Sequence, residues 1–154
     1  MTTVAIRTVV DDAELAAACR LLQSFFRNGR FDTPPTPETV AAHARRMHGL
    51  TNLCRILVGW LDDAAVAVAT VSLDFGIEFG WQAEIGDLYV APSARGQGLA
   101  FRLVEACSAW ARERGAQSVA VTLTAHGADS GLEDFYRRLG FTSDGRRLLI
   151  RRLG

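Results

Sequence analysis

The stretch that decides the fold reads Ala83-Glu84-Ile85-Gly86-Asp87-Leu88-Tyr89-Val90 and continues as Ala91-Pro92-Ser93-Ala94-Arg95-Gly96-Gln97-Gly98-Leu99-Ala100. Its first part is a short apolar run that predicts a strand. The residues from Leu99 to Gly115 have the apolar spacing of an amphipathic helix, and a turn with two glycines separates the two elements. The first amides of such a helix have no internal partners, and the helix dipole places positive charge at the same end.

This turn has the chemistry of an anion-binding site. Gly96 and Gly98 remove the side chains that would keep a phosphate away from the amides, and Arg95 adds a cation with forked donors. We interpret the turn as a cradle for a pyrophosphate. A P-loop is excluded because it needs a Lys where this chain has Leu99, and the chain contains no Lys at all. A dinucleotide fingerprint is excluded because Phe101 stands where that motif needs Gly or Ala.

What remains is the pattern Arg95-x-x-Gly98-x-Ala100, preceded by Leu88-Tyr89-Val90-Ala91-Pro92. It resembles the acyl-CoA signature of the GNAT N-acetyltransferase superfamily. The later run Phe135-Tyr136-Arg137-Arg138-Leu139-Gly140-Phe141 resembles the closing helix-and-strand motif of that family. The resemblance implies an acetyl-CoA-dependent N-acetyltransferase, with coenzyme A as co-substrate and no metal, that transfers its acetyl group directly in a ternary complex.

Length and composition limit the number of domains and the kinds of partner that the protein can have. The chain has 154 residues, which predicts one domain spanning residues 1–154. It carries 17 acidic and 17 basic residues, and this zero net charge argues against a nucleic-acid partner. Cys19, Cys54 and Cys107 lie far apart in apolar surroundings, which is typical of reduced core thiols. The N-terminus has no signal-peptide pattern, and no apolar run has the length of a membrane span, so we expect a soluble, cytoplasmic protein without a membrane partner.

The order of predicted elements indicates an α/β fold: a single GNAT-like domain with a mixed, mostly antiparallel sheet flanked by helices. The expected order is β-α-α-β-β-β-α-β-α-β-β. In residue numbers, the expected elements are a strand over 4–9, helices from Asp11 or Asp12 to Arg27 and from Pro37 to His48, a hairpin of strands 54–61 and 65–74, a strand over 83–90, a helix from the cradle to Gly115, a strand over 118–124, a helix over 132–139, and last strands at Phe141 and over 148–153. Phe75 to Trp81 is expected to be a connection.

The resemblance also implies how coenzyme A binds. The strand at Leu88 to Val90 bulges and splays away from the strand at Ser118 to Thr124, and the pantetheine arm adds to the exposed edge. An amide near Leu88 or Tyr89 then polarises the thioester carbonyl. The cofactor-binding residues implied in this way are Leu88, Tyr89, Val90, Arg95, Gly96, Gln97, Gly98, Leu99, Ala100, Asp129 and Tyr136.

Two carboxylates are candidates for the base that deprotonates the acceptor amine. Glu84 lies four residues before Leu88 and shares its strand parity, as a catalytic Glu does in many family members. Asp87 has the opposite parity before any bulge. The run Asp87-Leu88-Tyr89-Val90 nevertheless resembles the Asp-Leu-Ala-Val of aminoglycoside 3-N-acetyltransferases, where the Asp faces the acceptor. For both carboxylates, a salt bridge to a nearby Arg is the structural alternative.

Tyr136 is the candidate acid that protonates the departing thiolate, because an ordinary Tyr pKa near 10 lies above that of a thiol. The pattern Asp129-x-x-Leu132-x-x-x-Tyr136 is similar to the family's Asn-x-x-Ala-x-x-x-Tyr. It departs from that pattern at Asp129 and Leu132. Asp at the first position also occurs in the aminoglycoside 3-N group. The alternative for Tyr136 is a half-buried core aromatic residue.

The acceptor is the least determined part of the prediction. In the family the first two helices and their connection form the acceptor side, which implies Phe26, Arg30, Phe31 and Asp32, and His126 lies in a loop where the cleft opens. Acidic residues suit a polycationic amine such as an aminoglycoside antibiotic, and they are Glu78, Glu84, Asp87, Asp129 and Asp134. A protein N-terminus or lysine is the enzymatic alternative, and a non-catalytic acyl-CoA-binding module is the other. A homodimer is expected by analogy alone.

Overall fold

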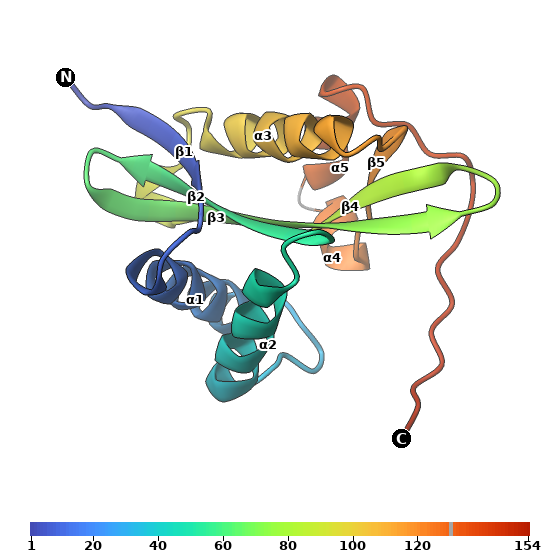
Figure 1. Ribbon diagram of the computed structural model, residues 1–154, viewed down its shortest axis with the longest axis horizontal. Coiled ribbons are helices and arrows are strands. Elements are labelled where there is room, and N and C mark those ends of the chain that lie inside the picture. The colour runs from blue at the N-terminus through green and yellow to red at the C-terminus, as the bar shows by residue number, and fades with distance from the viewer. Residues whose placement is uncertain (130) are drawn as a thin grey trace. The chain divides into compact units, whose positions relative to one another are not determined.

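The computed structural model describes residues 1–129 and 131–154, and the side chains of Ala128 and Asp129 also lie outside its described part. The chain divides into two compact units, Met1–Thr122 and Leu123–Gly154, and each is described by itself. Figure 1 shows the elements of both units.

The first unit is built on a five-stranded sheet in which the strands follow their order in the sequence. The strands are β1 (Val4–Thr8), β2 (Cys54–Leu61), β3 (Ala64–Gly76), β4 (Gly80–Val90) and β5 (Ser118–Val121). Strands β1 to β4 pair antiparallel, and β5 pairs parallel to β4. Asp62 makes the tight turn between β2 and β3 with φ 52°, a left-handed conformation that Asp tolerates better than most residues. The mixed, mostly antiparallel sheet that the sequence predicted is confirmed.

The hairpin of β3 and β4 is longer than the sequence predicted. Phe75 to Trp81 was expected to be a connection, but β3 extends to Gly76 and β4 begins at Gly80. Phe75 lies opposite Trp81 in the ladder, and their rings pack edge to face at 5.1 Å. Such cross-strand aromatic pairs stabilise a ladder beyond the point where the core stops covering it. The expectation of a connection here is therefore wrong.

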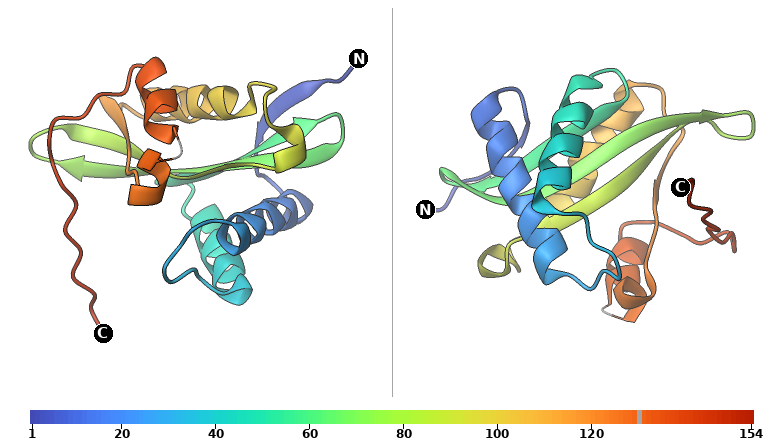
Figure 2. Two further views of the ribbon diagram at one scale, coloured as in Figure 1. Left: turned by 180° about the vertical axis from the view of Figure 1, so that it is seen from behind. Right: turned by 90° about the horizontal axis from the view of Figure 1, so that it is seen from below.

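Helices cover both faces of this sheet (Figures 1 and 2). On one face lie α1 (Asp12–Asn28) and α2 (Pro37–Gly49), and on the other lies α3 (Leu99–Glu113). The side chain of Asp11 caps α1 by accepting from the amide of Glu14 at 2.8 Å, and Thr36 caps α2 by accepting from Thr39 at 3.1 Å. The predicted helix starts are thus confirmed by the hydrogen bonds that satisfy the first-turn amides.

The two faces have separate cores. Under α1 and α2 the packing is aliphatic and centres on side chains such as Ala18, Val58 and Val68, which are at most 1% exposed. Under α3 it centres on Leu99 and Leu103, which are also at most 1% exposed. Close approach explains one glycine here: a Cβ on Gly59 would lie 3.0 Å from the Ala67 Cβ and 3.2 Å from the Leu99 side chain.

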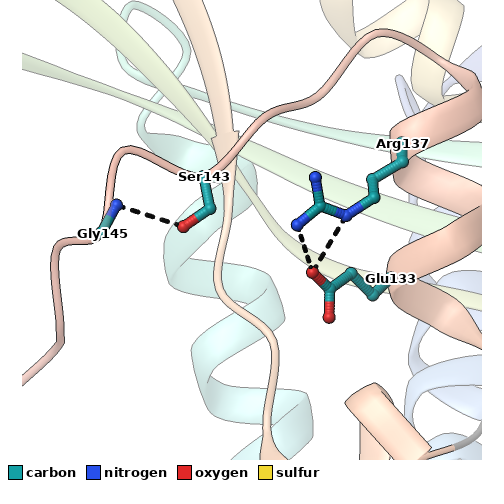
Figure 3. Close-up of polar contacts among 4 residues, drawn as sticks. All are labelled: Glu133, Arg137, Ser143 and Gly145. Carbon is teal, nitrogen blue, oxygen red and sulfur yellow. Dashed lines mark hydrogen bonds and ion pairs between the residues drawn. The ribbon is translucent and has the colours of Figure 1, made fainter.

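The second unit contains two short helices, α4 (Ala125–Asp129) and α5 (Leu132–Arg138). On α5, Glu133 accepts two hydrogen bonds from the guanidinium of Arg137, at 2.6 and 3.0 Å (Figure 3). Further along the chain, the amide of Gly145 donates to the Ser143 hydroxyl at 3.3 Å (Figure 3).

The last two predicted strands are absent. Phe141 and residues 148–153 have neither helix nor strand, and the predicted strand over 118–124 ends at Val121. A strand is maintained by ladder hydrogen bonds to a neighbour, and the described sheet ends at β5 without pairing to these segments. Leu148, Leu149, Ile150 and Leu153 are between 67% and 91% exposed, so burial does not support a strand either.

A substitution in the α3 core tests this packing. Leu103→Ala should lower the free energy of unfolding by about 3 kcal/mol, because the fully buried side chain leaves a cavity against the sheet. Glu105→Ala on the exposed side of the same helix is the matched control and should stay within about 0.5 kcal/mol of the parent. Chemical denaturation followed by circular dichroism measures both values. Equal stability of the two variants would contradict the assignment of this face.

Candidate functional site

Strand β4 contains a β-bulge at Gly86. Thr70 of β3 lies opposite Asp87, and the next residue, Val71, lies opposite Ile85, so Gly86 has no partner on β3. An isolated glycine suits this place because a bulge disrupts the regular pleat. The bulge shifts the alternation of β4 side chains by one residue at this point.

The shift puts both candidate bases on the same face of the sheet. Thr70 and Ser72 are two residues apart on β3 and therefore share a face. Thr70 lies opposite Asp87, and Ser72 lies opposite Glu84. Directly opposite residues share a face, so Glu84 and Asp87 lie together on the α1 and α2 side, and Leu88 lies on the other side. The expectation that Glu84 shares its face with Leu88 is therefore wrong, because it assumed an unbroken period of two.

The bulge also marks where β4 and β5 part. Their parallel ladder runs from Gln82 opposite Ser118 to Ile85 opposite Val121, and β4 then continues to Val90 with β3 alone. Within the first unit, the edge of residues 86–90 that faces away from β3 has no ladder partner. This is the bulge and splay that the resemblance implied for Leu88 to Val90. An edge of this kind can accept an extended chain as an additional strand.

The turn after β4 presents unpaired amides. Gly96 and Gly98 have φ of 82° and 77°, and Gly98 is the N-cap of α3 without a side-chain cap. Within the described part of the structure, the amides from Gly96 to Phe101 make no hydrogen bond. Arg95 is exposed, and its Nε donates to the Val90 carbonyl at 3.0 Å. We call residues 95–101 the cradle; it can surround an anion with backbone donors, a helix dipole and one guanidinium.

Asp87 is a largely buried carboxylate with one hydrogen bond in the described structure. The Thr70 hydroxyl donates to its Oδ2 at 2.6 Å, and Thr70 itself is 3% exposed. Burial raises the pKa of Asp87 above its ordinary value of 3.8, and the Thr70 hydrogen bond opposes that rise in part. A raised carboxyl pKa is the property of a general base that must exchange protons near neutral pH.

Glu84 has a different environment. It is exposed, and its Oε1 accepts a long hydrogen bond of 3.4 Å from the Thr122 hydroxyl. Among the side chains that the structure describes, neither Glu84 nor Asp87 forms an ion pair with an arginine, which was the structural alternative for both. The two carboxylates differ in burial, so they are suited to different roles.

An aromatic cluster lies on the same face of the sheet. The rings of Phe25, Phe26 and Phe31 contact one another with centroids 5.0 to 5.2 Å apart, and Phe25 also contacts Tyr89 at 5.6 Å. Gly29 permits this arrangement, because a Cβ there would meet the Phe31 ring within 3.0 Å. The three Phe side chains are partly exposed, and their contact with Tyr89 brings this ring-lined surface to the strand residue two positions from Asp87 on the same face.

The structure brings some predicted acceptor residues together and leaves others apart. Phe26 and Phe31 join the cluster, whereas Arg30 and Asp32 are exposed beside it without a hydrogen bond in the described structure. Glu78 lies at the tip of the β3–β4 hairpin, well along the chain from the bulge.

The remaining predicted residues belong to the second unit. Tyr136 on α5 is 5% exposed, and its ring contacts those of Phe135 and Phe141 at 5.1 and 5.2 Å. His126 is exposed on α4. The side chain of Asp129 lies outside the described residues. Burial among these rings is the environment of the core aromatic residue that was the alternative for Tyr136, and its role as the acid stays a prediction.

Sequence reasoning missed three residues of this site: Thr70, Gly86 and Phe25. Two of them carried a readable signal. Gly86 is an isolated glycine inside a strand, which favours a bulge, and Thr70 interrupts an apolar run between Ala69 and Val71. The role of Phe25 depends on how the chain turns back at Gly29, which no periodicity shows.

The three cysteines do not have the properties of a covalent acetyl carrier. Cys54 and Cys107 are 8% and 0% exposed, and burial raises the pKa of both thiols, that of Cys107 to about 12. Burial also raises the pKa of the Cys19 thiol. The thiolate is the nucleophilic form, and all three environments disfavour it.

The model of the acetyltransferase (GNAT) family matches residues 15–141. No curated protein sequence matches the chain. In the described residues, no group of three or more His, Cys, Asp or Glu is placed to hold a metal ion, and no helix has the length and apolarity needed to cross a membrane.

Several solved structures share the fold. An aminoglycoside N-acetyltransferase, AAC(6')-Iy, in complex with CoA, is 17% identical with a TM-score of 0.81, over 99% of this chain and 96% of that one. An integron cassette protein from the mobile metagenome of Cole Harbour Salt Marsh is 23% identical with a TM-score of 0.82, over 97% and 90%. The aminoglycoside acetyltransferase meta-AAC0020 from an uncultured soil metagenomic sample, in complex with sisomicin, is 20% identical with a TM-score of 0.76, over 97% and 95%.

The buried carboxylate predicts how stability depends on pH. Because the native pKa of Asp87 is raised, the folded state binds the carboxyl proton more tightly than the unfolded state does. The free energy of unfolding therefore falls as pH rises from the ordinary pKa of 3.8 to the higher native pKa. Asp87→Asn removes the ionisation and keeps an oxygen for Thr70. It should therefore be more stable than the parent at pH 7, by about 1 kcal/mol or roughly 3 °C.

This gain should disappear below the ordinary carboxyl pKa of 3.8, where Asp87 is protonated in both states. Thermal unfolding of both proteins from pH 3 to pH 8 measures it. A variant that is less stable than the parent by the same amount at every pH would show that burial of Asp87 has no cost.

Proposed function

This chain belongs to the GNAT acetyltransferase family and is an acetyl-CoA-dependent N-acetyltransferase, and we propose that its acceptor is a small polycationic amine such as an aminoglycoside antibiotic. The observation that carries the proposal is the pair of carboxylates, Glu84 and Asp87, that the bulge puts on one face of the sheet. Carboxylates attract ammonium groups, and the neighbouring aromatic rings attract cations through their faces. An acceptor with several amines satisfies both features.

The cradle is proposed to hold the pyrophosphate of coenzyme A. The amides from Gly96 to Phe101 supply donors, and the Arg95 guanidinium, tied to the Val90 carbonyl by its Nε, has its remaining donors for the phosphate oxygens. The pantetheine arm then adds to the open edge at Leu88 to Val90, where an amide polarises the thioester carbonyl. Gln97, Leu99 and Ala100 contribute backbone to the same turn.

Transfer proceeds by direct attack of the amine on the thioester. Asp87 accepts a proton from the ammonium, the free amine forms a bond to the carbonyl carbon, and the bond to sulfur breaks. Tyr136, the acid that the resemblance implies, gives its proton to the departing thiolate. The nitrogen loses a second proton as the amide forms, and this proton restores the tyrosine hydroxyl. The products are the amide and free coenzyme A, and Asp87 releases the first proton to solvent. Glu84 is proposed to attract a second ammonium of the acceptor, because an exposed carboxylate suits binding better than proton transfer.

Two further considerations support this acceptor class. Proteins that share the fold include AAC(6')-Iy and meta-AAC0020, both described as aminoglycoside acetyltransferases. The run from Asp87 to Val90 resembles the aminoglycoside 3-N group, and this subgroup remains a prediction. Antibiotic resistance would be the biological consequence of such an activity.

An acceptor panel tests the proposal. The measurement is the release of free coenzyme A thiol from acetyl-CoA in the presence of each amine. The value of kcat/KM should be at least about tenfold higher for aminoglycosides or polyamines than for amino acids or peptides. Higher salt should raise KM for the polycations, because screening weakens their attraction to Glu84 and Asp87. A preference for peptide N-termini or lysines would replace this proposal with a protein acetyltransferase, and no turnover with any amine would favour a binding module.

A matched pair of substitutions tests the cradle. Asn and Asp both tolerate the left-handed conformation of Gly98, a Cβ there meets no atom within 4 Å, and both residues cap helices well. Gly98→Asn should weaken coenzyme A binding only modestly. Gly98→Asp should weaken it by about a hundredfold more, because its carboxylate repels the pyrophosphate without unfolding the helix.

Calorimetric titration with coenzyme A measures both affinities, and thermal unfolding confirms that both variants fold. Equal affinities for the Asn and Asp variants would indicate that the pyrophosphate binds elsewhere.

A further inference from the structure

We propose that Thr70 is a positioning residue for the acetyl transfer: its hydroxyl holds one oxygen of Asp87 and turns the other toward the incoming amine. The inference rests on the proposed role of Asp87 as the base. Thr70 does not contact the substrate itself in this account. It acts through the carboxylate, across the ladder between β3 and β4.

Packing alone does not explain why residue 70 is a threonine. Its neighbours Ala69 and Val71 are at most 1% exposed, and Thr70, at 3%, is the one buried Ser, Thr, amide or charged residue among those the structure describes. Val has the same shape as Thr and would fill this space without a polar group. A buried hydroxyl is costly unless it is hydrogen bonded, and here its partner is the Oδ2 of Asp87 at 2.6 Å.

The bulge provides the geometry for this bond. Thr70 and Asp87 face each other at the last regular pair before the extra residue. A Cβ on Gly86 would lie 3.2 Å from the Thr70 hydroxyl oxygen, closer than a methyl group normally packs. Gly86 therefore leaves room for the hydroxyl to reach the carboxylate. The glycine, the threonine and the aspartate form one unit.

No arginine performs this function for Asp87. The titratable and charged groups on the same face include Glu84 and Tyr89 on β4, Asp74 on β3, Arg7 on β1 opposite Val58, Cys54 on β2 opposite Ser72, and Cys19 on α1. Across the described residues, none of them makes a hydrogen bond or ion pair with Asp87. The Thr70 hydroxyl is the interaction that fixes the orientation of the carboxylate and favours its ionised form against burial.

The test compares Thr70→Val with Thr70→Ser. Thr70→Val should still fold, with a melting temperature a few degrees lower because the Asp87 carboxylate loses its partner, and it should lower kcat about tenfold at pH 7 and leave KM for acetyl-CoA unchanged. Loss of the hydroxyl raises the pKa of Asp87 further, so the acid limb of the kcat/KM profile should move to higher pH. Thr70→Ser keeps the hydroxyl and should restore most of kcat and the original acid limb.

Two more variants separate this proposal from the proposed function. Asp87→Asn should lower kcat strongly, and adding Thr70→Val to it should cause little further loss, because the hydroxyl then has no carboxylate to hold. Gly86→Ala, which crowds the hydroxyl without removing it, should move the acid limb in the same direction as Thr70→Val.

The outcomes are distinct. If Asp87→Asn is impaired but Thr70→Val keeps the parent kcat and pH profile, the positioning role is overturned and the proposed function stands. If Asp87→Asn retains full activity, Asp87 is not the base and the proposed mechanism fails. If Thr70→Ser is as impaired as Thr70→Val, packing rather than the hydroxyl is responsible, which also overturns the inference.

Discussion

One extra residue in one strand is the constraint on which the site depends. Gly86 has no partner on β3, and its insertion changes which face the later side chains of β4 occupy. Without it, Asp87 would point to the α3 side, into a core of fully buried Leu99 and Leu103. With it, Asp87 joins Glu84 on the side of the aromatic cluster. The same local irregularity coincides with the end of the ladder to β5, so it also opens the edge of residues 86–90.

The two halves of the proposed acetyl-CoA site come from one continuous segment. β4 supplies the open edge, and the turn that follows supplies unpaired amides before α3 begins at Leu99. The Arg95 side chain ties the two together through its hydrogen bond to the Val90 carbonyl. The buried face of α3 fixes the helix against the sheet, so the orientation of its N-terminus follows from core packing. In the proposed site, a short stretch of rigid backbone would therefore set the binding geometry of a long, flexible ligand.

The parts of the fold that could be predicted from the sequence are those determined by residues close together in the chain. The helix starts at Asp11 and Thr36 follow from side-chain caps, and the strand-turn-helix of the cradle follows from its glycines and apolar spacing. The alternation of side chains along β4 could not predict that Glu84 and Leu88 lie on opposite faces of the sheet, because a bulge breaks the period of two between them. The contact of Phe31 with Phe25 depends on tertiary folding around Gly29. The last strands were wrongly predicted from an apolar run alone, since a strand also needs a partner edge.

The composition of the α1 and α2 face explains why the site is where it is. Around Ala18, Val58 and Val68 this face is a tightly buried aliphatic core. Toward β4 it changes to partly exposed rings and then to a carboxylate whose burial raises its pKa. A charged group so placed lowers stability at neutral pH, and a sequence selected for stability alone would have a neutral residue there. The proposed function explains why the carboxylate is retained: it would accept a proton beside a surface proposed to bind cations. The Thr70 hydroxyl is its one hydrogen-bond partner in the described structure.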